Sequence, residues 1–150
     1  MKPLMVWGSD AFSQFRLDAL SEKITAALSS QKAVRIEAQF VYLLDAGRSL
    51  DAQTLARART LLGASQREPA PGGFFVTPRK GTISPWSSKA TDIFRNCGLA
   101  EVKRVERGVY LRAFAQEAEL SLTALRPALN LLHDRMTEGV YLELDDLFEH

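Results

Sequence analysis

The segment 79–93, which reads RKGTISPWSSKATDI, contains the residues whose types and spacing could bind an anion. Ser84 followed by Pro85 is typical of a helix start, because serine caps the first turn and proline fits the first helical position. That turn presents free backbone N–H groups at the positive end of the helix dipole. The candidate binding residues all lie on or just before this turn: Arg79, Lys80, Thr82, Ser84, Trp86, Ser87 and Lys89.

The charge around this helix start favours a negatively charged ligand or surface. No acid lies between Glu68 and Asp92, and the same stretch carries three cations. A phosphate or a carboxylate would suit such a place. The segment is not a phosphate-binding P-loop, since Ser88 rather than glycine precedes Lys89. Helix capping explains the same residues without a ligand, and the spacing does not decide between a small anion and an acidic protein surface.

Other residues capable of chemistry have simpler explanations. Cys97 follows Ile93 and Phe94 on the apolar side of the same predicted helix, at its negative end, which opposes thiolate formation. We therefore predict a buried structural thiol. His133 has no second histidine, cysteine or carboxylate at metal-ligand spacing, so we expect a histidine at a helix edge. The acids of segment 143–149 are expected to form a solvated end that could assist docking. We expect no catalytic residue and no metal site.

The composition narrows the possible classes of protein. The 150 residues suffice for one domain, and the single cysteine suits a reducing compartment. The net charge of +1 argues against general nucleic-acid binding, and the segment 107–114 matches the RNA-binding aromatic motif at only a few positions. No apolar run approaches a membrane span, and the N-terminal residues lack the features of a signal peptide. We expect a cytoplasmic protein with no nucleic-acid or membrane partner.

The first part of the chain predicts two strands and two helices. The apolar run 4–7 indicates a strand closed by Gly8, after which Ser9 or Asp10 could cap a helix. Segment 34–44 begins with alternating apolar residues and becomes continuously apolar, as in a strand covered on both faces. A second helix is expected to open at Ser49 or Asp51. The first helix presents one apolar face: Leu17, Leu20, Ile24 and Leu28.

The second part predicts a strand at 74–78, the helix beginning near Pro85, and an extended segment at 101–115. Gly108 in the middle of that segment suggests a hairpin or a bulge. A last helix is expected from Ser121 or Thr123, with Pro127 near its first turn or at a kink. Segment 140–144 reads as a final strand. The last helix carries an apolar stripe: Leu122, Leu125, Leu129, Leu132 and Met136.

From residue 74 onward this order is that of a ferredoxin-like βαββαβ unit. The first part gives a similar succession of strand, helix, long strand and helix. We therefore predict an α+β fold made of tandem ferredoxin-like units. The two related halves would cover about 1–72 and 73–150 and form a single domain.

Several stretches resemble one enzyme family. VTPRKGTISPWSSKATDIFRNCGL at 76–99, followed by VKRVERGVYL at 102–111, resembles the N-terminal region of the large, single-chain phosphoribosylformylglycinamidine synthase. GSDAFSQFRLDAL at 8–20 and LHDRMTE at 132–138 are similar to the same family. This resemblance covers most of the chain and is densest at 77–99.

The resemblance implies a role in purine biosynthesis. The family's enzyme, also called FGAM synthetase or FGAR amidotransferase, uses ATP and glutamine to convert FGAR to FGAM. Its N-terminal domain looks like two copies of the βαββαβ accessory subunit found in the split form. The partners implied are the synthetase and glutaminase domains of the same full-length chain, which this domain would bridge while helping to form the ammonia path.

The resemblance also implies that ATP and Mg²⁺ bind elsewhere in the full-length enzyme and that this domain holds no cofactor. A carbon–nitrogen ligase of this type would not be catalytic in these 150 residues alone. The alternative is an independent small protein that binds an anion or regulates another protein.

Overall fold

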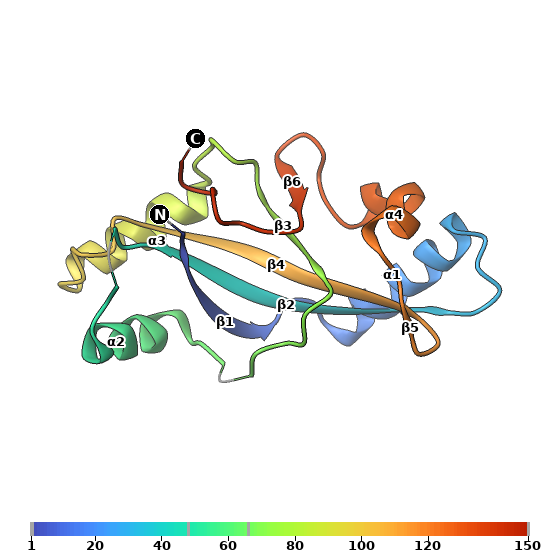
Figure 1. The fold of residues 1–150 in the computed structure, drawn as a ribbon, viewed down its shortest axis with the longest axis horizontal. Helices are drawn as coiled ribbons and strands as arrows, with labels where there is room; N and C mark the ends of the chain where they lie inside the picture. Colours follow the sequence, from blue (N-terminus) through green and yellow to red (C-terminus); the bar gives the residue numbers. More distant parts are fainter. Residues whose placement is uncertain (1, 48, 66, 150) are drawn as a thin grey trace.

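The computed structural model describes residues 2–47, 49–65 and 67–149. It is an α+β fold, as the sequence predicts, in which antiparallel strands form one sheet (Figure 1). The elements follow in the order β1 (Leu4–Asp10), α1 (Gln14–Ala27), β2 (Val34–Asp45), α2 (Ala52–Leu62), β3 (Phe74–Pro78), α3 (Pro85–Asn96), β4 (Arg104–Ala115), β5 (Ala118–Glu119), α4 (Leu122–Leu125), the 3-10 helix η1 (Arg126–Leu131) and β6 (Glu138–Tyr141).

Two long strands form the centre of the sheet. The strand order is β1-β2-β4-β3-β6, and the short β5 pairs with the end of β4. β2 and β4 pair along their whole lengths, from Val34 opposite Ala115 to Asp45 opposite Arg104. Because side chains alternate between the faces of a strand, even-numbered residues of β2 share a face with odd-numbered residues of β4. This register determines which side chains meet at the candidate site.

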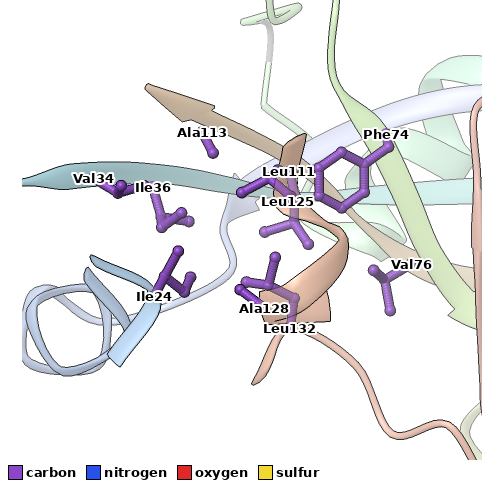
Figure 2. Packing of buried hydrophobic residues seen from close by; sticks show 10 residues of the cluster. All are labelled: Ile24, Val34, Ile36, Phe74, Val76, Leu111, Ala113, Leu125, Ala128 and Leu132. Atoms are coloured by element: carbon purple, nitrogen blue, oxygen red, sulfur yellow. The ribbon is translucent and has the colours of Figure 1, made fainter. Parts of the chain in front are cut away.

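Helices cover one face of the sheet at both ends of the long strands. Figure 1 shows α2 and α3 at one end and α1 and α4 at the other. Figure 2 shows the core beneath α1 and η1, where side chains from strands and helices point into the same space. The residues of this core are Ile24, Val34, Ile36, Phe74, Val76, Leu111, Ala113, Leu125, Ala128 and Leu132.

A second core lies beneath α2 and α3. Phe94 of α3 and Ala58 of α2 are buried against Tyr42 and Leu44 of β2 and Val105 of β4. The opposite face of the sheet is covered at this end by the C-terminal segment. The strands and this segment bury a third cluster of residues between them: Val41, Leu43, Phe75, Tyr110, Leu144 and Leu147.

Four hydroxyl or carboxylate caps fix the helix starts. Asp51, Ser84 and Ser121 cap α2, α3 and α4, and each side chain accepts from a backbone N–H three residues later, which confirms these predictions. The first helix differs, because its cap is Ser13 rather than Ser9 or Asp10. Those two residues belong to β1, which continues through Gly8 to Asp10 with a register shift.

Gly108 does not interrupt its strand. The prediction of a hairpin or bulge was wrong, because β4 runs unbroken from Arg104 to Ala115. The glycine is explained by close approach instead: an added Cβ would lie 2.6 Å from Thr77 Cγ2 and 3.0 Å from the Val76 carbonyl oxygen. A side chain at this position would collide with the neighbouring strand.

The last predicted helix is shorter than its apolar stripe suggests. α4 ends at Leu125 and the chain continues as η1, since Pro127 has no N–H and cannot extend α-helical hydrogen bonding. Leu125 and Leu132 are buried as predicted, but Met136 lies beyond the helix and is 81% exposed. The final strand is likewise displaced, occupying Glu138–Tyr141 rather than 140–144.

Candidate functional site

The start of α3 is a capped helix terminus attached to the sheet. Ser84 has extended backbone angles, and its Oγ accepts from Ser87 N at 3.0 Å. Pro85 is at the first turn, as its position after serine predicts. Ser87 is fully buried, and its hydroxyl donates to the Val105 carbonyl oxygen at 2.5 Å. The two serines therefore hold α3 against β4.

A buried carboxylate lies beside this helix start. Ser84 Oγ donates to Glu106 Oε1 at 2.8 Å, and Arg104 Nη2 is 3.2 Å from Glu106 Oε2. Only 1% of the Glu106 side chain is exposed. A small anion bound at this helix start would have to share it with Glu106. The stretch between Glu68 and Asp92 contains no acid, but β4 places the carboxylate of Glu106 beside it.

Three of the candidate residues stabilise the chain around the turn that precedes α3. Thr82 Oγ1 donates to the Arg79 carbonyl oxygen at 2.7 Å, and the Thr82 carbonyl oxygen accepts from Arg104 Nη2 at 2.7 Å. The Arg79 guanidinium donates to the Arg135 carbonyl oxygen. Lys80 forms an ion pair with Asp146, and its ammonium lies 4.4 Å from the centre of the Tyr141 ring.

This ion pair gives the acidic C-terminal segment an internal partner. Leu144 and Leu147 are buried in the face opposite the helices, and Asp146 between them pairs with Lys80. Asp145 is 3.4 Å from Lys2 Nζ. Part of the segment that the sequence suggests as a solvated end is therefore packed on the sheet.

Trp86 and Lys89 lie on the other side of the helix start, where the surface is open. Trp86 is half-buried and stacks on Tyr42, with ring centres 5.9 Å apart. Lys89 is exposed one turn later. Both line a shallow cleft of about 300 Å³ between α2 and α3. The seven candidate residues thus separate into internal contacts and this outward pair.

A neighbouring cleft contains residues that the sequence analysis missed. It has a volume of about 340 Å³ and is lined by the starts of both α1 and α3. Arg107 lies over two of its rings, 4.8 Å from the centre of Phe40 and 4.9 Å from that of Trp86. Arg16 lies 3.8 Å above Phe12. Stacked guanidinium groups keep N–H donors available for carboxylate or phosphate groups.

The residues of this cleft could have been predicted from the register of β2 and β4, but not from any local sequence motif. Arg107 is directly opposite Tyr42 in the β2–β4 ladder, and Phe40 is opposite Val109. This contact affects the pKa of Tyr42. Burial raises the pKa of the phenol, and the positive charge of Arg107 opposes that rise. Alternation would have placed these residues on one face once the two strands were known to pair.

Cys97 and His133 do not line either of the two clefts described above. Cys97 is exposed, so the prediction of a buried thiol was wrong. The helical face buries Ala90 and Phe94, whereas Ile93 is 51% exposed and the chain turns at Gly98 with a φ of +81°. His133 is half-buried just beyond η1, its Nδ1 2.7 Å from the Leu129 carbonyl oxygen.

Within the described part of the chain, no group of three or more histidine, cysteine, aspartate or glutamate side chains is placed to hold a metal ion. No helix among the same residues is long and apolar enough to cross a membrane. The described side chains around α3 instead bring together stacked cations, aromatic rings and hydroxyl groups.

Comparison with known families adds one finding. The family model for the formylglycinamide ribonucleotide amidotransferase N-terminal region matches residues 39–149. The match begins inside β2 and continues through the C-terminal segment, so it contains α3, the central strand β4 and all seven candidate residues.

Proposed function

Because the chain belongs to the formylglycinamide ribonucleotide amidotransferase N-terminal family, we propose that it is the accessory domain that bridges the synthetase and glutaminase parts of FGAM synthetase. The family match is the observation that carries this proposal. The activity served is the step of purine biosynthesis that converts FGAR to FGAM with ATP and glutamine. In this role the domain contributes a binding surface and helps to form the path for ammonia.

The chemistry would take place in the other domains. ATP and Mg²⁺ bind there under this proposal, and the cysteine-dependent glutamine hydrolysis belongs to the glutaminase part. Cys97, at the C-terminal end of α3, lines neither of the clefts beside Trp86. We place the enzyme in the cytoplasm, since its domain here needs no disulfide.

The surface at α3 supports an inter-domain contact. Trp86 and Lys89 face outward from a helix that Ser84, Ser87 and Thr91 hold rigidly against β4. Rigid placement of an aromatic ring favours binding, because little side-chain entropy is lost. Arg79, Lys80 and Thr82 would act indirectly by fixing the turn before the helix.

Two related halves, about 1–72 and 73–150, are part of the proposal. The spacing of the caps supports it: Ser13 and Ser84 begin the helices that precede β2 and β4, and Asp51 and Ser121 begin those that follow them. Each pair is about 70 positions apart, as a duplicated supersecondary unit would give.

The proposal is tested by assaying the purified 150-residue chain beside the full-length enzyme that contains it. We expect the chain to show neither ATP hydrolysis nor FGAM formation from ammonia or glutamine, and the full-length enzyme to show both. Circular dichroism and thermal unfolding would establish that the chain is folded in the assay. ATP turnover by the folded chain alone would contradict an accessory role.

A further inference from the structure

The two clefts beside Trp86 adjoin, because Trp86 and Arg107 line both of them, and together they make one concave surface. We call this the arginine groove. It crosses the helix-covered face of the sheet from the start of α1, past the start of α3, to the space between α2 and α3. A groove of this extent suits an extended or helical segment of another domain more than a single small ion.

The groove carries three cations. Arg107 and Arg16 stack on rings, and Lys89 projects from α3. None of these three side chains has an ion-pair partner among residues 2–47, 49–65 and 67–149. Unpaired cations in a concave surface attract carboxylates, and low-dielectric walls of aromatic rings strengthen that attraction.

The acids that line the groove do not neutralise these cations. Glu106 is engaged by Arg104 and Ser84. Glu138 lines the same cleft, and its Oε1 accepts from the Asp134 backbone N–H. Three cations therefore face one carboxylate that has no ion-pair partner in the described chain, so the groove is net positive.

Apolar side chains lie along the same groove. Ile93 and Leu61 line its α2–α3 end, and they are 51% and 42% exposed. Phe12, Phe40 and Trp86 line the remainder. Large apolar groups beside unpaired cations are typical of a surface that another protein segment covers.

We propose that the arginine groove holds an acidic segment of the synthetase or glutaminase part, with carboxylates on Arg107 and Arg16 and an apolar side chain between Ile93 and Leu61. This inference rests on the proposed function and adds the site and the chemistry of the contact. A small phosphorylated ligand would use the arginines but would leave the apolar end of the groove empty.

The test is photo-crosslinking within the full-length enzyme. Ile93→p-benzoylphenylalanine places a photoreactive ring at the exposed rim of the groove, and mass spectrometry identifies the segment that it captures. We expect a segment from outside residues 1–150 in which aspartate and glutamate outnumber lysine and arginine. Capture of a basic segment would overturn this inference while leaving the domain contact intact. Capture of nothing outside residues 1–150 would count against both.

Removal of the charges supplies the matched control. We expect the double variant Arg16→Gln and Arg107→Gln to lower the crosslink yield roughly tenfold, and more at low than at high ionic strength. Arg35→Gln also removes a guanidinium that stacks on a ring, in this case the ring of Phe114. Arg35 is an odd-numbered residue of β2, so its side chain lies on the face of the sheet opposite the groove. It should leave the yield unchanged.

An unchanged yield in the double variant would overturn the inference. An increased KM for FGAR, with the crosslink intact, would overturn it in favour of a small phosphorylated ligand. The proposed function would survive either result, because it requires a contact but not one made by these arginines.

Discussion

Ser84 Oγ donates a hydrogen bond of 2.8 Å to Glu106 Oε1, joining the cap of α3 to the first part of the central strand β4. The same hydroxyl accepts from Ser87 N at 3.0 Å, so one side chain serves the helix and the sheet together. Arg104 neutralises the carboxylate from the same strand. The helix that presents Trp86 and Lys89 is therefore positioned by a buried ion pair.

Loss of Glu106 should strongly destabilise the fold. Glu106→Ala leaves Arg104 partly buried without its carboxylate and removes the acceptor for Ser84, and breaking such a pair costs about 3–5 kcal/mol. Urea denaturation of the chain measures the change in the free energy of unfolding. Glu37→Ala is the control: it also pairs with arginines, but its side chain is 47% exposed, so we expect at most about 1 kcal/mol. Equal effects of the two substitutions would contradict the structural role of Glu106.

Gly108→Ala should destabilise through overpacking. The new methyl group would meet Thr77 Cγ2 at 2.6 Å, and Thr77 is fully buried, so we expect a cost of about 1–3 kcal/mol in thermal or urea unfolding. Gly63→Asn is the matched control. Gly63 has a φ of +63° and nothing within 4 Å of an added Cβ, and asparagine accepts that backbone conformation. A milder effect at Gly108 than at Gly63 would show that β3 and β4 are not so close.

Cys97 should react with a thiol reagent in the native protein. It is the single cysteine and it is exposed, so the native chain should modify as fully as the chain unfolded in urea. Ellman's reagent, with Cys97→Ser as the blank, measures the reaction. A native thiol that reacts only after unfolding would favour the buried position that the sequence suggested.

Tyr42 should make stability decline in alkaline solution. Its folded pKa is raised by burial above the ordinary value of 10.0, so the unfolded chain ionises first. This contribution to stability is present below about pH 10 and is lost as the pH rises through the folded pKa. Tyr42→Phe should flatten the decline in unfolding free energy measured by urea titration from about pH 8 to about pH 11, a range that brackets the ordinary tyrosine pKa.

The Arg107 charge provides an independent check on the same group. Arg107→Gln should raise the pKa of Tyr42 further, because the cation that favours the phenolate is gone. Ultraviolet absorbance follows tyrosinate formation, with Arg35→Gln as the control on the opposite face. A lower pKa in Arg107→Gln would contradict the placement of the guanidinium beside Tyr42.

The sequence predicted elements wherever local chemistry decides the structure. Ser84 with Pro85 gave the start of α3, and the alternation that begins at Val34 gave the long strand β2. The apolar face of α1 around Ile24 was also correct. In each of these cases the hydrogen-bonding group or the periodicity lies within a few residues.

Errors arose where the deciding partner is distant in sequence. Gly108 reads as a break, but its reason is Thr77 on a neighbouring strand. Cys97 continues an apolar spacing, yet α3 ends there, the chain turns at Gly98, and Leu99 is buried in its place. The arginine groove was missed because Arg16 and Arg107 come together only through strand pairing and helix packing.

The central claim, that this domain serves another part of FGAM synthetase, is tested most directly by comparing two substrates. Trp86→Ala and Lys89→Ala, placed together in the full-length enzyme, should reduce glutamine-dependent FGAM formation roughly tenfold while ammonia-dependent formation falls much less, since a weakened contact uncouples the domains. Thermal unfolding verifies that the variant is folded. Equal and undiminished rates with glutamine and with ammonia would contradict the account.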